Sequence, residues 1–156
     1  MKLIKIFFSL IFLFFSNNVL SKEEVINLQL KDGIVKIKTL DDKAPNHVQQ
    51  IKDLVAQGKY DGVVFHRVID GFMAQTGDVQ FGNSNSESFD LRRAGTGGSG
   101  NNINAEFNDT PHLDGQYTVW GEVIEGMEFV DMIKKGDPIK NGMVDDPDKI
   151  IKMWIE

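Results

Sequence analysis

Four side chains that could act together on an amide group fall within the stretch 63–78. They are Arg67, Phe72, Met73 and Gln75. An Asp70-Gly71 pair between them is a strong signal for the turn of a β-hairpin, so the pattern predicts two short strands. An arginine stays protonated and presents its N–H donors in a rigid fork, and the aromatic and thioether groups are apolar. Together they could bind a small apolar ring and hydrogen-bond the amide attached to it.

Period-2 alternation in the first strand divides its side chains between two faces. It predicts one face with Val63, Phe65 and Arg67, and an opposite face with Val64, His66 and Val68. We expect His66 to be a hydrogen-bonded structural histidine.

The order of residues across this hairpin resembles the signature of cyclophilin-type peptidyl-prolyl cis-trans isomerases. The matching segments are Phe65-His66-Arg67-Val68-Ile69, Gly71-Phe72-Met73-Ala74-Gln75 and Gly77-Asp78. Weaker matches extend from about Val25 to the C-terminus. The resemblance implies a mainly β fold, an antiparallel β-barrel with two helices, and rotation about Xaa-Pro peptide bonds in proline-containing polypeptide substrates. It implies no cofactor and no metal.

The resemblance assigns the catalytic role to Arg67. A prolyl bond faces a rotational barrier of about 18–20 kcal/mol because the amide is conjugated. As the amide twists, its nitrogen regains a lone pair, and a fixed cationic donor aimed at that nitrogen stabilises the twisted state. The alternative is that Arg67 makes a surface salt bridge.

The remaining site residues are also implied by the resemblance. Phe72 and Met73 would line the proline pocket, with packing in the core as the alternative. Gln75 would hydrogen-bond the substrate backbone, or be an exposed strand residue. Leu113 and Tyr117 match positions on the opposite wall of the groove, whereas Trp120 is expected in the core.

The flanking chain alternates short strands with two helices. Alternation and turn signals predict strands at 25–31, 34–40, 118–123 and 150–155, and helices that begin near Pro45 and Gly126 and end at Gly58 and Gly136. A Gly-, Asn- and Ser-rich loop covers 82–104. By the resemblance its segment Gly95–Gly98 flanks the substrate groove; a flexible loop without contacts is the alternative.

One part of the family pattern is missing between Asp109 and Leu113. Family members carry about two strands there, roughly 30 residues with their connections. We therefore expect an incomplete barrel with unpaired strand edges and half of the proline pocket absent.

Composition and the N-terminus indicate an exported single domain. The chain has 156 residues, of which 41% are hydrophobic and 26% charged. Residues 1–21 read as a signal peptide, with Lys2 and Lys5 around an apolar run too short to span a bilayer. The domain would occupy 22–156, in the periplasm. An uncleaved membrane anchor is the alternative.

Charge and residue usage exclude several partners and chemistries. Without the two lysines of residues 1–21, 15 basic residues face 23 acidic ones, a net charge of −8, which argues against nucleic acid or anionic lipid as partner. Cysteine is absent, and His47, His66 and His112 lack metal-ligand spacing. We expect a monomer with no stable membrane span after cleavage.

Three hypotheses remain open at the level of the sequence. The first is an exported peptidyl-prolyl isomerase that assists protein folding. The second is a catalytically impaired domain that only binds proline-containing or unfolded segments, using an open strand edge. The third is an unstable truncated product.

Overall fold

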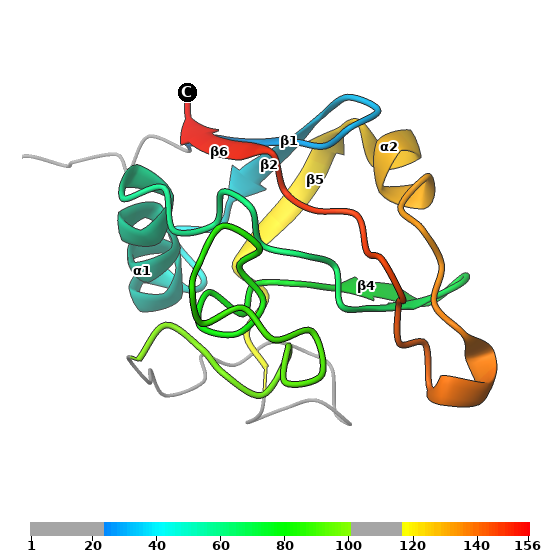
Figure 1. Cartoon of the computed structure of the whole chain (residues 1–156). Helices are drawn as coiled ribbons and strands as arrows, with labels where there is room; N and C mark the ends of the chain where they lie inside the picture. Colours follow the sequence, from blue (N-terminus) through cyan, green and yellow to red (C-terminus); the bar gives the residue numbers. More distant parts are fainter. Residues whose placement is uncertain (1–23, 101–116) are drawn as a thin grey trace, which may run out of the picture.

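The computed structural model describes residues 24–100 and 117–156. In chain order the elements are β1 (Val25–Gln29), β2 (Ile34–Thr39), α1 (Pro45–Ala56), β3 (Arg67–Ile69), β4 (Met73–Gln75), β5 (Gly121–Glu125), α2 (Met127–Asp131), the 3-10 helix η1 (Pro138–Lys140) and β6 (Lys152–Ile155) (Figure 1). Within these ranges no helix is both long enough and apolar enough to cross a bilayer.

The strands form two antiparallel sheets. The larger has the order β5-β2-β1-β6, and its register places Leu28 of β1 between Val35 of β2 and Met153 of β6. The smaller is the β3–β4 hairpin. A mainly β, antiparallel fold with two helices is therefore confirmed. In the described part of the chain the two sheets stay separate, so the barrel is not closed.

Local sequence signals explain the elements that were predicted well. The β1–β2 hairpin turns at Asp32-Gly33, where the Leu30 N–H donates to the Gly33 carbonyl at 2.8 Å. Helix α1 begins at Pro45, whose missing N–H has no role in the first helical turn, and Gly58 follows its end with a φ of 64°. Its stripe residues Val48 and Val55 are buried.

Several observed elements are shorter than the predicted ones. Strand β5 begins at Gly121 and β6 at Lys152, and helix α2 ends at Asp131. The chain after α2 leaves the helical path because the Gly136 N–H donates to the Val68 carbonyl of β3 at 2.9 Å. Tertiary pairing thus replaces the last predicted turn of this helix.

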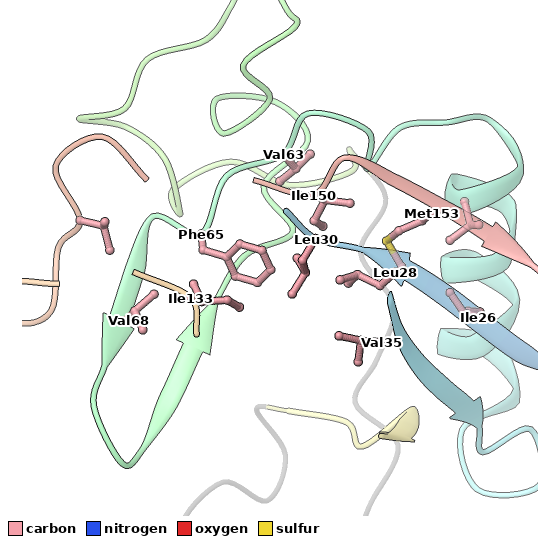
Figure 2. Close-up of a cluster of buried hydrophobic side chains, with 12 residues drawn as sticks. Ile26, Leu28, Leu30, Val35, Val63, Phe65, Val68, Ile133, Ile150 and Met153 are labelled. Atoms are coloured by element: carbon pink, nitrogen blue, oxygen red, sulfur yellow. The ribbon is translucent and has the colours of Figure 1, made fainter. Parts of the chain in front are cut away.

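The hydrophobic core joins the larger sheet to α1 and to the small hairpin (Figure 2). Its buried members are Ile26, Leu28, Leu30, Val35, Val55, Val63, Phe65, Val68, Ile133, Val144, Ile150 and Met153. Trp120 packs against this cluster, as predicted. The core therefore fixes β3 relative to the larger sheet.

The strand predicted over 63–68 is shorter than expected. The residues Val63, Val64, Phe65 and His66 are all buried, and the strand begins only at Arg67. The reason is that this segment has neighbouring chain on two sides. The Val64 N–H donates to the Gly82 carbonyl, and the Phe65 N–H donates to the Asp148 carbonyl, both at 2.9 Å. These hydrogen bonds occupy the two edges of the segment, whereas its side chains are covered separately: Val63 and Phe65 lie in the hydrophobic core and His66 lies against Gly95.

Replacing a core isoleucine tests this description of the core. Ile26 is fully buried, so Ile26→Ala should lower the free energy of unfolding by about 3 kcal/mol through lost burial and the cavity left behind. Ile139 is 96% exposed, so the matched variant Ile139→Ala should change it by less than about 0.5 kcal/mol. Denaturant unfolding followed by circular dichroism measures both; equal losses would contradict the core.

Candidate active site

Arg67 is the first residue of β3, and its guanidinium is held at the surface of the hairpin. Its Nε donates to the backbone carbonyl of Asn141, and its Nη2 donates to Asn141 Oδ1, each at 2.8 Å. Its Nη1 lies 3.5 Å from Gln75 Oε1. No carboxylate of the described residues forms an ion pair with it. The salt-bridge alternative for Arg67 is therefore not what this geometry shows.

Hairpin register places three of the predicted site residues on one face. Arg67 is paired with Gln75, and Ile69 with Met73, so these side chains share the face opposite to Val68 and Ala74. Val68 is buried in the core, and Ala74 packs against it. The face that carries Arg67, Met73 and Gln75 therefore points away from the core.

Phe72 lies in the turn and is 77% exposed. It lines, with Met73, a hollow of about 310 Å³ between the hairpin tip and α2, whose far side is formed by Met127, Val130, Asp131 and Lys135. Arg67 and Gln75 are not among the residues that line this hollow. The structure thus joins Phe72 to Met73, and Met73 to Arg67 and Gln75, without enclosing all four in one cleft.

Leu113 and Tyr117, which were predicted on the opposite wall of the groove, do not form part of the face that carries Arg67 in the described structure. Leu113 lies outside the described residues. Tyr117 is 64% exposed at the start of the second described range.

A buried carboxylate fixes the glycine-rich loop beside the hairpin. Asp78 Oδ1 accepts from the backbone N–H groups of Gln80 and Phe81, and Oδ2 accepts from those of Gly95 and Gly97, at 2.8–3.0 Å. Burial raises the pKa of Asp78, but the four donors outweigh it and hold the pKa below its usual range. The loop therefore has defined contacts here, contrary to the contact-free alternative.

His66 packs under the same loop. A Cβ on Gly95 would lie 2.4 Å from His66 Nε2, so the close approach needs glycine, which also supplies a φ of 93°. Burial lowers the pKa of His66, and the charge of Arg67 lowers it further against the opposite effect of Asp78. His66 Nδ1 is buried and has no hydrogen-bond partner within the described chain. His66 was predicted to be a hydrogen-bonded structural histidine; it is buried, but its Nδ1 lacks such a bond among the described residues.

Sequence reasoning missed Asn141, which supplies two of the acceptors around Arg67. The sequence analysis assigned it no role. The signal that could have marked it is the Asn141-Gly142 pair, because Asn-Gly favours a turn with two left-handed residues. Nothing in the sequence shows that this turn reaches Arg67.

A family model matches most of the chain. The model is that of the cyclophilin type peptidyl-prolyl cis-trans isomerases, and it matches residues 25–109 and 103–155. The chain belongs to this family. The two matched segments overlap at residues 103–109, directly before the position where the sequence analysis found part of the pattern missing.

Relatives of this cyclophilin include named isomerases from bacteria. A probable peptidyl-prolyl cis-trans isomerase of Brucella abortus is 48% identical over 164 residues, covering 86% of this chain and 83% of the relative. A peptidyl-prolyl cis-trans isomerase of Helicobacter pylori is 32% identical over 143 residues, covering 78% of this chain and 87% of the relative.

A solved structure supports the fold. It is a cyclophilin type isomerase of Cryptosporidium parvum, crystallised in the presence of the dipeptide Ala-Pro, with a TM-score of 0.66 and 19% identity. The similarity covers 85% of this chain and 98% of the other.

The Brucella comparison measures the missing part. The alignment has 164 positions, whereas 86% of the 156-residue chain is about 134 residues. About 30 aligned positions therefore have no residue in this chain. That number agrees with the predicted absence of two strands.

Asp78→Asn tests how the carboxylate holds the loop. At neutral pH we expect the free energy of unfolding to fall by about 2–3 kcal/mol, because an amide nitrogen would face two backbone donors. The folded-state pKa of Asp78 is lowered, so its stabilisation is present above the unfolded pKa of about 4 and is lost as the pH falls through the folded pKa.

The difference in the free energy of unfolding between the wild-type chain and this variant should therefore narrow as the pH falls below about 5 in denaturant titrations. Asp70→Asn is the control, because the Asp70 side chain is 84% exposed. A difference that stays constant over this range would refute the role of the charged form.

Proposed function

We propose that this cyclophilin catalyses rotation about Xaa-Pro bonds through the face that carries Arg67, Met73 and Gln75. The observation that carries the proposal is the guanidinium, which three acceptor contacts from Asn141 and Gln75 hold on this face. No described carboxylate neutralises it. A fixed cation that no carboxylate neutralises is what stabilisation of a twisted amide requires.

Each residue has a defined part in the proposed mechanism. Arg67 donates to the prolyl nitrogen as the amide leaves planarity and the nitrogen regains its lone pair. Gln75 hydrogen-bonds the substrate backbone, and Met73 with Phe72 contacts the proline ring. Leu113 and Tyr117 complete the opposite wall. No covalent intermediate forms, so neither a nucleophile nor a cofactor takes part.

The setting we propose is the folding of exported proteins. Residues 1–21 would be a signal peptide and 22–156 one monomeric domain in the periplasm, with proline-containing polypeptides as substrates and no nucleic acid partner. Support comes from Lys2, Lys5 and the apolar run between and after them, and from the acidic balance of the remaining chain.

A second candidate, binding without catalysis, is favoured by one observation. The hollow that Phe72 and Met73 line does not include Arg67, and Phe72 is 77% exposed. Apolar contact with a proline ring could then form apart from the guanidinium.

Substitution of Arg67 separates the two candidates. Arg67→Ala should lower kcat/KM for an Xaa-Pro peptide about 100-fold, as loss of a preorganised donor does elsewhere. Arg67→Lys should retain an intermediate rate, because it keeps the charge without the fork. Rates are measured by a cis-trans isomerisation assay on the purified chain.

The matched control for this series is Arg92→Ala. The Arg92 side chain is 92% exposed and lies 3.5 Å from Asp90. It should retain the wild-type rate. If the wild-type chain is active and Arg67→Ala retains its rate, the assignment is wrong. A folded wild-type chain that binds the peptide without accelerating exchange would favour the second candidate.

Export is tested by expression with the natural N-terminus in a Gram-negative bacterium. We expect the protein in the periplasmic fraction, with the mass of a chain that begins at Lys22. Cleavage after Ser21 fits the preference of signal peptidase for small residues before the cleavage site. A full-length mass in the membrane fraction would instead support the uncleaved anchor.

A further inference from the structure

Asn141 occupies one whole edge of the Arg67 guanidinium. The Nε and Nη2 groups form that edge, and both donate to the same residue, one to its backbone carbonyl and one to its side-chain oxygen, at 2.8 Å each. Two parallel hydrogen bonds fix the direction of a planar guanidinium more strictly than one does. The remaining group, Nη1, points toward Gln75 on the face of the hairpin that lies away from the core.

The backbone of Asn141 is set for this contact. Asn141 and Gly142 both have left-handed φ values, 56° and 77°, and the Met143 N–H donates to the Lys140 carbonyl at 3.2 Å. This is the pattern of a type I′ turn, for which Asn-Gly is a preferred pair. A Cβ on Gly142 would lie 2.6 Å from Ile69, so the turn packs directly on β3.

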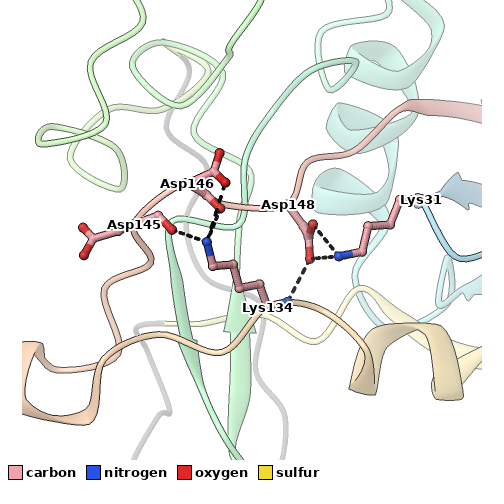
Figure 3. Close-up of polar contacts among 5 residues, drawn as sticks. All are labelled: Lys31, Lys134, Asp145, Asp146 and Asp148. Carbon is pink, nitrogen blue, oxygen red and sulfur yellow. Dashed lines mark hydrogen bonds and ion pairs between the residues drawn. The ribbon is translucent and has the colours of Figure 1, made fainter.

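Hydrogen bonds join the segment that carries the turn to β3, and further contacts hold the two ends of this loop together at its base, near Lys134 and residues 145–148. The Val68 N–H donates to the Gly142 carbonyl, and the Val144 N–H donates to the His66 carbonyl. At the base, Lys134 Nζ donates to the carbonyls of Asp145 and Asp146 at 2.6 and 2.9 Å (Figure 3).

A carboxylate, that of Asp148, holds the same part of the loop. Asp148 accepts from the Lys134 N–H and from Lys31 Nζ, both at 2.8 Å (Figure 3). The loop that carries Asn141 is therefore held in place by hydrogen bonds and ion pairs.

We propose that Asn141 is the positioning residue of this site: it holds one edge of the guanidinium so that the other edge faces the substrate. The proposal rests on the proposed function of Arg67. Asn141 acts through Arg67 and does not itself contact the substrate. Being neutral, it orients the guanidinium without cancelling the charge that the twisted amide would use.

Asn141→Gly is the decisive variant, because glycine keeps the left-handed backbone and its carbonyl but removes Oδ1. We expect kcat to fall about tenfold with KM changed less than about twofold, since orientation is lost and apolar binding is kept. In an Arg67→Ala background the same substitution should cause no further loss.

Asp146→Gly is the matched control. Asp146 has a φ of 53°, is the other non-glycine residue with positive φ in the described ranges, and does not contact Arg67. It should keep the wild-type kcat. A kcat for Asn141→Gly equal to that of the control, or a full additional loss in the Arg67→Ala background, would overturn the proposal.

A second readout is independent of activity. The Arg67 Nε–H signal in a ¹⁵N NMR spectrum should shift and exchange faster with water in Asn141→Gly, and stay unchanged in Asp146→Gly. An unchanged Arg67 signal in both variants would refute positioning. If the wild-type chain is inactive while this signal responds as expected, the proposed function fails and the positioning contact stands.

Discussion

The register of the β3–β4 hairpin is the constraint on which the geometry of the site depends. Side chains alternate across a strand, so Val68 in the core requires Arg67 on the outer face, and a slip of one residue would exchange them. The Asp70-Gly71 turn sets this register at one end. The Gly142 carbonyl and the Asn141 side chain fix it at the other, because both bind β3 directly.

The polar and apolar halves of the site are unequally supported. The polar half has the two contacts of Asn141 and the nearby Gln75. The apolar half has Met73 on the same face and a largely exposed Phe72 in the turn. About 30 aligned positions of the Brucella relative have no residue in this chain. Any catalysis by this cyclophilin must therefore rely on electrostatic stabilisation more than on enclosure of the proline ring.

The sequence predicted the elements whose signals are local. The Asp32-Gly33 and Asp70-Gly71 turns, Pro45 at the helix start and the Val48/Val55 stripe all act within a few residues, and the structure bears them out. The strand predicted over 63–68 begins only at Arg67, because the preceding residues pair with chain far away in sequence, at Gly82 and Asp148. Alternation within a segment does not show which distant chain it will pair with.

The residues of the site likewise divide into those predictable from local signals and those placed by contacts distant in sequence. Arg67, Met73 and Gln75 come together because they lie on one hairpin, whose register follows from the turn. Asn141 lies 74 residues further along the chain than Arg67, and its contact depends on a loop folded back on β3. The family resemblance assigned the catalytic role to Arg67, but only the tertiary structure shows which groups hold its guanidinium.

The rate of cis-trans exchange in a short Xaa-Pro peptide, measured by exchange NMR with and without the wild-type chain, tests the central claim most directly. If a held guanidinium lowers the rotational barrier, exchange cross-peaks should build up faster in proportion to the concentration of the chain. Exchange at the uncatalysed rate, in a sample that unfolds cooperatively on heating, would contradict it.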